Sequence, residues 1–80
     1  MLQAKIYISL KESILDPQGI TIQNALHSLN FKEVEKVRMG KFIQLWLNTS
    51  DKEEAKKRVE EMCKNLLVNE VIETYKYEIL

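Results

Sequence analysis

Hydrophobic positions recur at every second residue between Val34 and Leu47. One face of an extended strand would carry Val37, Met39, Ile43, Leu45 and Leu47, and the other would carry Phe42 and Trp46. The parity continues across Gly40, which favours one long strand that kinks or bulges there over a two-residue hairpin, whose preferred sequences differ. Because both faces are apolar, we expect a second chain to help cover this strand.

Two outer segments show the same alternation. Residues 3–10 and the final ten residues each predict a half-buried strand. Their apolar faces are expected to carry Ala4, Ile6, Ile8 and Leu10 in the first strand and Val71, Tyr75, Tyr77 and Ile79 in the last, with Ile72 opposite.

Two helices are predicted between the strands. The first begins with Asp16 as N-cap and Pro17 at the first helical position, and ends where Asn30 takes the left-handed conformation. The second runs from residue 51 to about 67, opened by a capping box of Ser50 and Glu53. The side chains expected to be buried are Ile22, Ala25, Leu26 and Leu29 in the first helix and Ala55, Val59, Met62, Cys63, Leu66 and Leu67 in the second.

The element order is therefore β-α-β(β)-α-β, an α+β arrangement related to ferredoxin-like domains. We expect a single domain over residues 1–80, made of two half-units of about 1–39 and 40–80. If the central strand holds these halves apart, each completes its sheet with the other half of a second chain. That predicts an obligate, interlocked homodimer, and a dimer of dimers stays open.

The charge balance excludes some partners. Twelve basic and twelve acidic residues give zero net charge, so neither nucleic acid nor an anionic membrane is an expected partner. No apolar run is long enough to span a bilayer, and a single cysteine cannot cross-link a secreted fold. We therefore expect a cytoplasmic protein.

No catalytic, cofactor-binding or metal-binding set is apparent in the sequence. Cys63 lies on the apolar stripe of the second helix without a nearby histidine, which is typical of an inert core thiol. His27 is the sole imidazole and has no further ligand at metal-binding spacing, so a contact with a partner or an exposed helix position suits it better.

The remaining candidates are contact residues. Arg38 and Lys41 flank Gly40, where a partner's carboxylate or another anion can approach, although the spacing of a phosphate-binding loop is absent. Gly19 lies in the first turn of a helix, which indicates close approach of another backbone segment. Four aromatic residues are expected to anchor an interface in preference to stacking single-stranded RNA: Phe42, Trp46, Tyr75 and Tyr77.

Three ordered segments resemble the PurS family. They are Leu15-Asp16-Pro17-Gln18-Gly19 with Ala25-Leu26-His27-Ser28-Leu29, then Val34-x-x-Val37-Arg38-x-Gly40-Lys41, then Met62-Cys63-x-x-Leu66-Leu67-x-Asn69 with Val71-Ile72-Glu73-x-Tyr75. The chain departs from the family where Glu12-Ser13 replaces Pro-Gly, Asn30 replaces Gly and Glu70 replaces Pro.

The resemblance implies the small subunit of formylglycinamide ribonucleotide amidotransferase, also called phosphoribosylformylglycinamidine synthase, an ATP-dependent enzyme of purine biosynthesis. It implies a bridge between a glutaminase subunit and a large synthetase subunit that helps ammonia pass between them. Any ATP and magnesium would then lie on the synthetase and no cofactor on this chain. The turn Asp16-Pro17-Gln18-Gly19 and the cations Arg38 and Lys41 would contact other parts of the assembly. A ligand-sensing domain of the ACT type, with a small molecule bound near Gly19, is the alternative.

Overall fold

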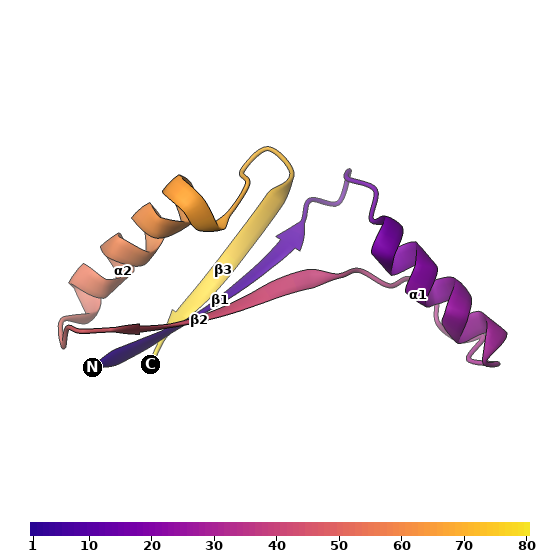
Figure 1. Ribbon diagram of the computed structural model, residues 1–80, viewed down its shortest axis with the longest axis horizontal. Helices are drawn as coiled ribbons and strands as arrows, with labels where there is room; N and C mark the ends of the chain where they lie inside the picture. Colours follow the sequence, from indigo (N-terminus) through magenta and orange to yellow (C-terminus); the bar gives the residue numbers. More distant parts are fainter.

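The computed structural model describes all of residues 1–80 and is built around a three-stranded antiparallel sheet (Figure 1). Its elements are β1 (Leu2–Leu10), α1 (Pro17–Ser28), β2 (Gly40–Leu47), α2 (Lys52–Met62), the π-helical turn η1 (Cys63–Leu67) and β3 (Glu73–Ile79). The strand order is β2-β1-β3, so β1 is central and β2 has a free outer edge. The expected α+β class is confirmed, with three of the four strands of a ferredoxin-like sheet in place.

The core forms where alternating apolar residues of the strands meet α2. Ile6 is opposite Ile43 on one side and Tyr77 on the other, and all three point toward α2. Ala4, Ile8, Val59 and Cys63 are also buried there. Phe42 and Trp46 are paired with Tyr7 and Gln3 on the opposite face of the sheet, as their even numbering predicts.

The central strand is shorter than predicted. β2 begins at Gly40, paired with Ser9, and residues 34–39 have no regular secondary structure. Because β1 ends at Leu10, the chain before Gly40 has no strand of this molecule beside it. The division into half-units of 1–39 and 40–80 stays a prediction; in one chain, β1 pairs with both later strands. The part that stands apart is residues 11–39, which we call the arm.

The first helix does not bury its apolar stripe. α1 extends away from the sheet, and Gly19 is its one buried residue (Figure 1). Ile22 and Leu29, expected in the core, are 36% and 68% exposed. The helix boundaries are as predicted: Asp16 caps the start, and Asn30 ends the helix with a φ of 76°. The amide groups of Asn30 and Phe31 donate to the carbonyls of His27 and Leu26, which completes a Schellman motif.

The second helix differs from the prediction at both ends. Its N-cap is Asp51, which accepts hydrogen bonds from the amides of Glu53 and Glu54. The predicted capping box of Ser50 and Glu53 is therefore wrong. At the other end η1 widens the last turn, and Val68 N–H donates to Cys63 O at 3.0 Å. This change of helical period leaves Leu66 83% exposed, contrary to the predicted burial.

Val71 was predicted in the last strand but lies outside β3. It is in the turn before β3 and is 78% exposed, while Tyr75, Tyr77 and Ile79 follow the expected face. No helix in the chain is long and apolar enough to cross a membrane.

Candidate functional site

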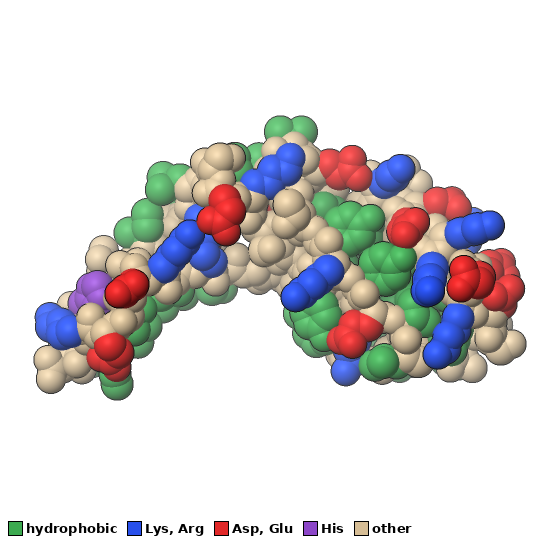
Figure 2. All heavy atoms as spheres, turned by 180° about the vertical axis from the view of Figure 1, so that it is seen from behind, with side chains coloured by type: hydrophobic (Ala, Val, Ile, Leu, Met, Phe, Trp, Pro, Cys, Tyr) green, Lys and Arg blue, Asp and Glu red, His purple; other side chains and the backbone are tan.

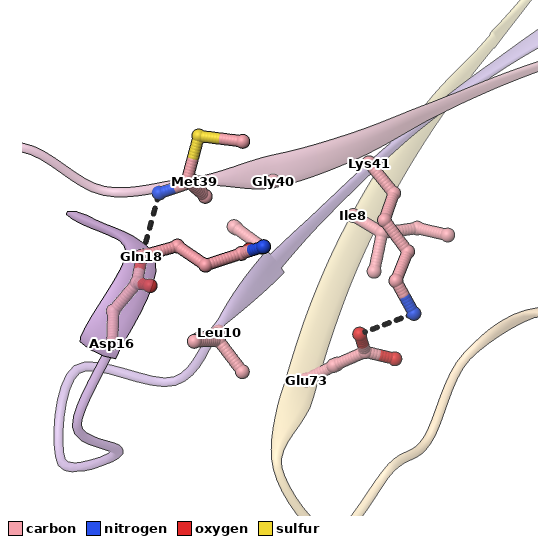
Figure 3. A pocket seen from close by; sticks show the side chains of 9 residues that line it. Ile8, Leu10, Asp16, Gln18, Met39, Gly40, Lys41 and Glu73 are labelled. Atoms are coloured by element: carbon pink, nitrogen blue, oxygen red, sulfur yellow. Dashed lines mark hydrogen bonds and ion pairs between the residues drawn. The ribbon is translucent and has the colours of Figure 1, made fainter. Parts of the chain in front are cut away.

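The base of the arm brings several predicted contact residues together. The chain leaves the sheet after β1 and returns to it at Gly40, so residues from both segments meet above the ends of the strands (Figure 3). Asp16, Gly40 and Lys41 line a hollow of about 130 Å³ at this junction. The other lining residues are Ile8, Ser9, Leu10, Gln18, Met39 and Glu73. Pro17 and Gly19 follow Asp16 in the first turn of α1.

Asp16 has both carboxylate oxygens occupied. Oδ1 accepts from Gly19 N–H at 3.0 Å and Oδ2 from Met39 N–H at 2.6 Å. The side chain is buried, with 4% exposure. These two amides, that of Met39 first, lower the pKa of Asp16, with Arg38 adding to the effect. Asp16 is therefore both a helix cap and a link across the base of the arm.

Gly19 permits the close approach that its position predicted. A Cβ at Gly19 would lie 2.2 Å from Val37 O. No other residue fits there without moving the returning segment. The backbone of this same chain therefore fills the space at Gly19 itself, and the close approach is an internal one.

Arg38 is engaged within its own chain. Its Nη1 donates to Ile14 O and its Nη2 to Lys11 O, both at 2.9 Å. These carbonyls belong to the loop between β1 and α1. Within one chain Arg38 therefore links the two segments of the arm, and its contact with a partner stays a prediction.

Lys41 pairs with Glu73, a carboxylate that was not among the predicted contact residues. Its Nζ lies 3.1 Å from Oε2 of Glu73, which is 8% exposed and also accepts from Asn69 N–H. The Asn69 amide and then Lys41 lower the pKa of Glu73. The parity of Glu73 with Tyr75 and Tyr77 was the available signal, since it places this carboxylate on the covered face.

An aromatic surface lies on the sheet face away from α2. Phe42 and Trp46 are 53% and 63% exposed, and Tyr7 stacks on Phe42 with ring centroids 5.1 Å apart. Tyr7 Oη donates to Glu78 at 2.6 Å, and this bond raises the pKa of Tyr7. We call Tyr7, Phe42 and Trp46 the open face. Sequence reasoning missed Tyr7, although its parity is opposite to that of Ile6 and Ile8.

The other predicted anchors lie elsewhere. Tyr75 and Tyr77 face α2, where Tyr77 Oη donates to Glu60 at 2.8 Å. His27 lies toward the far end of the arm, and its Nε2 donates to Val34 O at 2.6 Å. Both sets of contacts are internal, so neither forms part of the open face or of the hollow.

The arm has an uncovered apolar surface of its own. Ile20 and Ile22 of α1 are exposed, as is its C-cap Leu29. Leu15 and Phe31, on either side of the helix, are exposed too. Figure 2 shows the molecule as an arch, with hydrophobic side chains along the concave edge of the arm. A second set of partly buried apolar residues, including Ile43, Leu45 and Leu47, follows the free edge of β2.

Chemistry at the single thiol is suppressed by its surroundings. Cys63 is fully buried in the core, and burial, assisted by Glu60, raises its pKa. A protonated, enclosed thiol is a poor nucleophile. Nowhere in the chain do three His, Cys, Asp or Glu side chains converge in a way that would hold a metal ion.

Known proteins resemble this chain over its whole length. The family model PurS, described as phosphoribosylformylglycinamidine (FGAM) synthase, matches residues 3–80. The PurS subunit of phosphoribosylformylglycinamidine synthase from Bacillus subtilis is 51% identical over 79 residues, which are 99% of this chain and 93% of that protein. A crystal structure of B. subtilis PurS superposes with a TM-score of 0.90 at 50% identity, over 100% of this chain and 99% of the other.

A multi-subunit assembly also contains a matching chain. The structure of PurLQS from Thermotoga maritima matches with a TM-score of 0.88 at 33% identity, covering 100% of this chain and 99% of that chain. The agreement extends through the arm and the sheet alike. The chain therefore belongs to the PurS family of phosphoribosylformylglycinamidine synthase subunits.

Proposed function

We propose that this chain is a non-catalytic subunit of an ATP-dependent, glutamine-dependent phosphoribosylformylglycinamidine synthase in de novo purine (IMP) biosynthesis. In that role it docks the glutaminase onto the synthetase and aids ammonia transfer between them. The observation that carries the proposal is the full-length match to a chain of the T. maritima PurLQS assembly. The buried Cys63 and the internally bonded His27 agree with a role outside the chemistry itself.

The working form in this proposal is a homodimer. The Cα radius of gyration is 16.2 Å, whereas a compact chain of this length has about 12 Å. The accessible surface is 6003 Å², against about 5,000 Å² for a monomer of this mass. The arm of a second copy would supply an edge strand to β2 and an apolar helix beside α2. Both contacts would bury the excess accessible surface. The open face is then available for a dimer of dimers or for the enzyme subunits.

The contribution to the reaction would be positional. Ammonia released by a glutaminase must reach the activated amide before it is protonated or lost to water. A subunit that holds two active sites in register shortens that path without supplying a reacting group. ATP and magnesium belong to the synthetase in this proposal, and the assembly would act in the cytoplasm.

Size-exclusion chromatography of the three purified proteins tests the bridge. We expect the synthetase and glutaminase to co-elute when this chain is present and to elute separately when it is omitted. A complex of the two enzymes that forms equally well without it would overturn the proposal. Cognate subunits are used, with glutamine present to keep the glutaminase occupied.

A further inference from the structure

The arm is joined to the sheet by two extended segments that do not pair with each other. Residues 11–16 lead outward and residues 34–39 lead back, and no backbone–backbone hydrogen bond connects them. α1 makes no packed contact with the sheet that would hold the arm in one direction. Lys11 N–H donates to Ile72 O at 2.9 Å, which anchors only the first residue of the outward segment. Beyond that residue, the direction of the arm is set by side chains at its base.

Two side chains make reciprocal bonds across this base. Asp16 of the outward segment accepts from the backbone of Met39 on the return at 2.6 Å. Arg38 of the return segment donates to the backbone of Lys11 and of Ile14 on the outward one, at 2.9 Å each. Each segment thus holds the main chain of the other, as the Asp16–Met39 bond in Figure 3 shows for one half.

The other contacts at the base are an exposed ion pair and a close backbone approach at Gly19. Lys36 and Glu12 form an ion pair at 3.2 Å, but their side chains are 60% and 92% exposed, where such pairs contribute little. Gly19 lets the returning backbone lie against α1 and forms no side-chain bond.

We propose that Asp16 and Arg38 form a clasp that fixes the direction of the arm before the arm meets a second copy of this chain. The inference rests on the proposed homodimer and adds the residues that prepare it. An arm already held in its docking direction loses less conformational freedom on association than a swinging one. Opening the clasp weakens association while the sheet and α1 stay folded.

The chain provides a matched pair of variants, Asp16→Asn and Asp51→Asn. Both aspartates are N-caps, and both substitutions remove one negative charge. Asp51 accepts both of its hydrogen bonds through Oδ1, so an amide can retain them. Asp16 uses one oxygen for Gly19 and the other for Met39. Its amide variant has a single acceptor oxygen, so it cannot hold Gly19 and Met39 together and the link between the cap and the returning segment is broken.

Sedimentation equilibrium of the full chain over a concentration series measures the effect. A hydrogen bond to a charged acceptor corresponds to roughly a tenfold change in an equilibrium constant, so we expect about tenfold weaker self-association for Asp16→Asn. Asp51→Asn should stay within about twofold of the unmodified chain. Equal association constants for the two variants would overturn the clasp.

Amide resonances of the unmodified chain give a test that needs no variant. The signals of Gly19 and Met39 should move together as pH falls, since both amides donate to Asp16. The charged groups near it are Arg38, Lys41 and Glu73, with Glu12 and Lys36 farther out. The Asn69 amide donates to Glu73 and reports on that carboxylate separately.

Separate midpoints for Gly19 and Met39 would contradict the clasp even if Asp16→Asn failed to fold. Neither measurement uses the enzyme partners, so the clasp and the bridging role can fail independently. If the unmodified chain stays a monomer at every concentration, the proposed homodimer fails, and the shared midpoint still decides whether Asp16 links Gly19 to Met39.

Discussion

Tyr77 shows how one hydroxyl ties β3 to α2. Its bond to the carboxylate of Glu60, together with burial, raises the pKa of Tyr77 from 10.0 to about 12. The folded chain therefore holds this proton more tightly than the unfolded chain does. The resulting stabilisation is complete below pH 10 and is lost as the pH rises toward about 12.

Tyr77→Phe should reduce that alkaline loss. We expect the free energy of unfolding to fall less steeply between pH 10 and about 12 in the variant, as measured by urea unfolding at fixed pH. Some slope remains, because Tyr7 and Tyr75 also have raised pKa values. An unchanged slope would show that the Glu60 contact does not form in solution.

Parity along the strands was the part of the residue-level reasoning that the structure confirms. Ile43 and Trp46 are on the faces that their numbering predicts, because side chains alternate strictly in a strand. The partners of long side chains were not predictable in this way. Arg38 bonds to main-chain carbonyls 24 and 27 residues away, which no local pattern encodes.

At the scale of elements, the start of α2 offers a direct comparison of two neighbouring residues. Asp51→Ala removes the acceptor for two helix amides and should lower the free energy of unfolding by about 1 kcal/mol. Ser50→Ala should change it by no more than about 0.5 kcal/mol, because Asp51 is the N-cap. Thermal unfolding of both variants measures these changes in the free energy of unfolding. A larger loss of stability for Ser50→Ala than for Asp51→Ala would support the predicted capping box instead.

The end of α1 depends on a left-handed residue. Asn30 has a φ of 76°, a conformation that glycine adopts freely and alanine adopts at a cost of about 1–2 kcal/mol. We expect Asn30→Ala to destabilise the chain by about 1 kcal/mol in urea unfolding and Asn30→Gly to leave it unchanged or slightly more stable. Equal effects of the two substitutions would place the helix end elsewhere.

Helix starts and stops were largely predictable because they depend on a few adjacent residues. Asp16-Pro17 and Asn30 marked the limits of α1 correctly. The π-helical turn of α2 was not predictable from hydrophobic spacing, which assumes one period throughout. That wider turn is the physical reason why Leu66 is exposed although its spacing predicted burial.

At the scale of the whole molecule, the arm explains the largest differences between the prediction and the structure. The apolar stripe of α1 and the alternation of residues 34–39 are both present in the sequence. Within one chain no element packs on the apolar stripe of α1 and no strand pairs with residues 34–39. The helix is therefore exposed and the segment before Gly40 is irregular. These patterns fit burial between two chains, which a single copy cannot display.

Leu29→Asp tests that interpretation of the arm. Leu29 is 68% exposed in one chain, so the substitution leaves the sheet intact but places a charge where a second copy would dock. We expect self-association to fall by at least about tenfold in sedimentation experiments. Asn24→Asp adds the same charge at an exposed position within α1, and this variant should associate normally. Equal behaviour of the two variants would remove the arm from the interface.

The most direct test of the bridging role compares two nitrogen sources. Formylglycinamidine ribonucleotide formation is measured with the synthetase and glutaminase, with and without this chain, using glutamine in one series and ammonia in the other. We expect glutamine-driven turnover to require the chain and ammonia-driven turnover to proceed without it. Glutamine-driven turnover at the same rate in its absence would contradict the account.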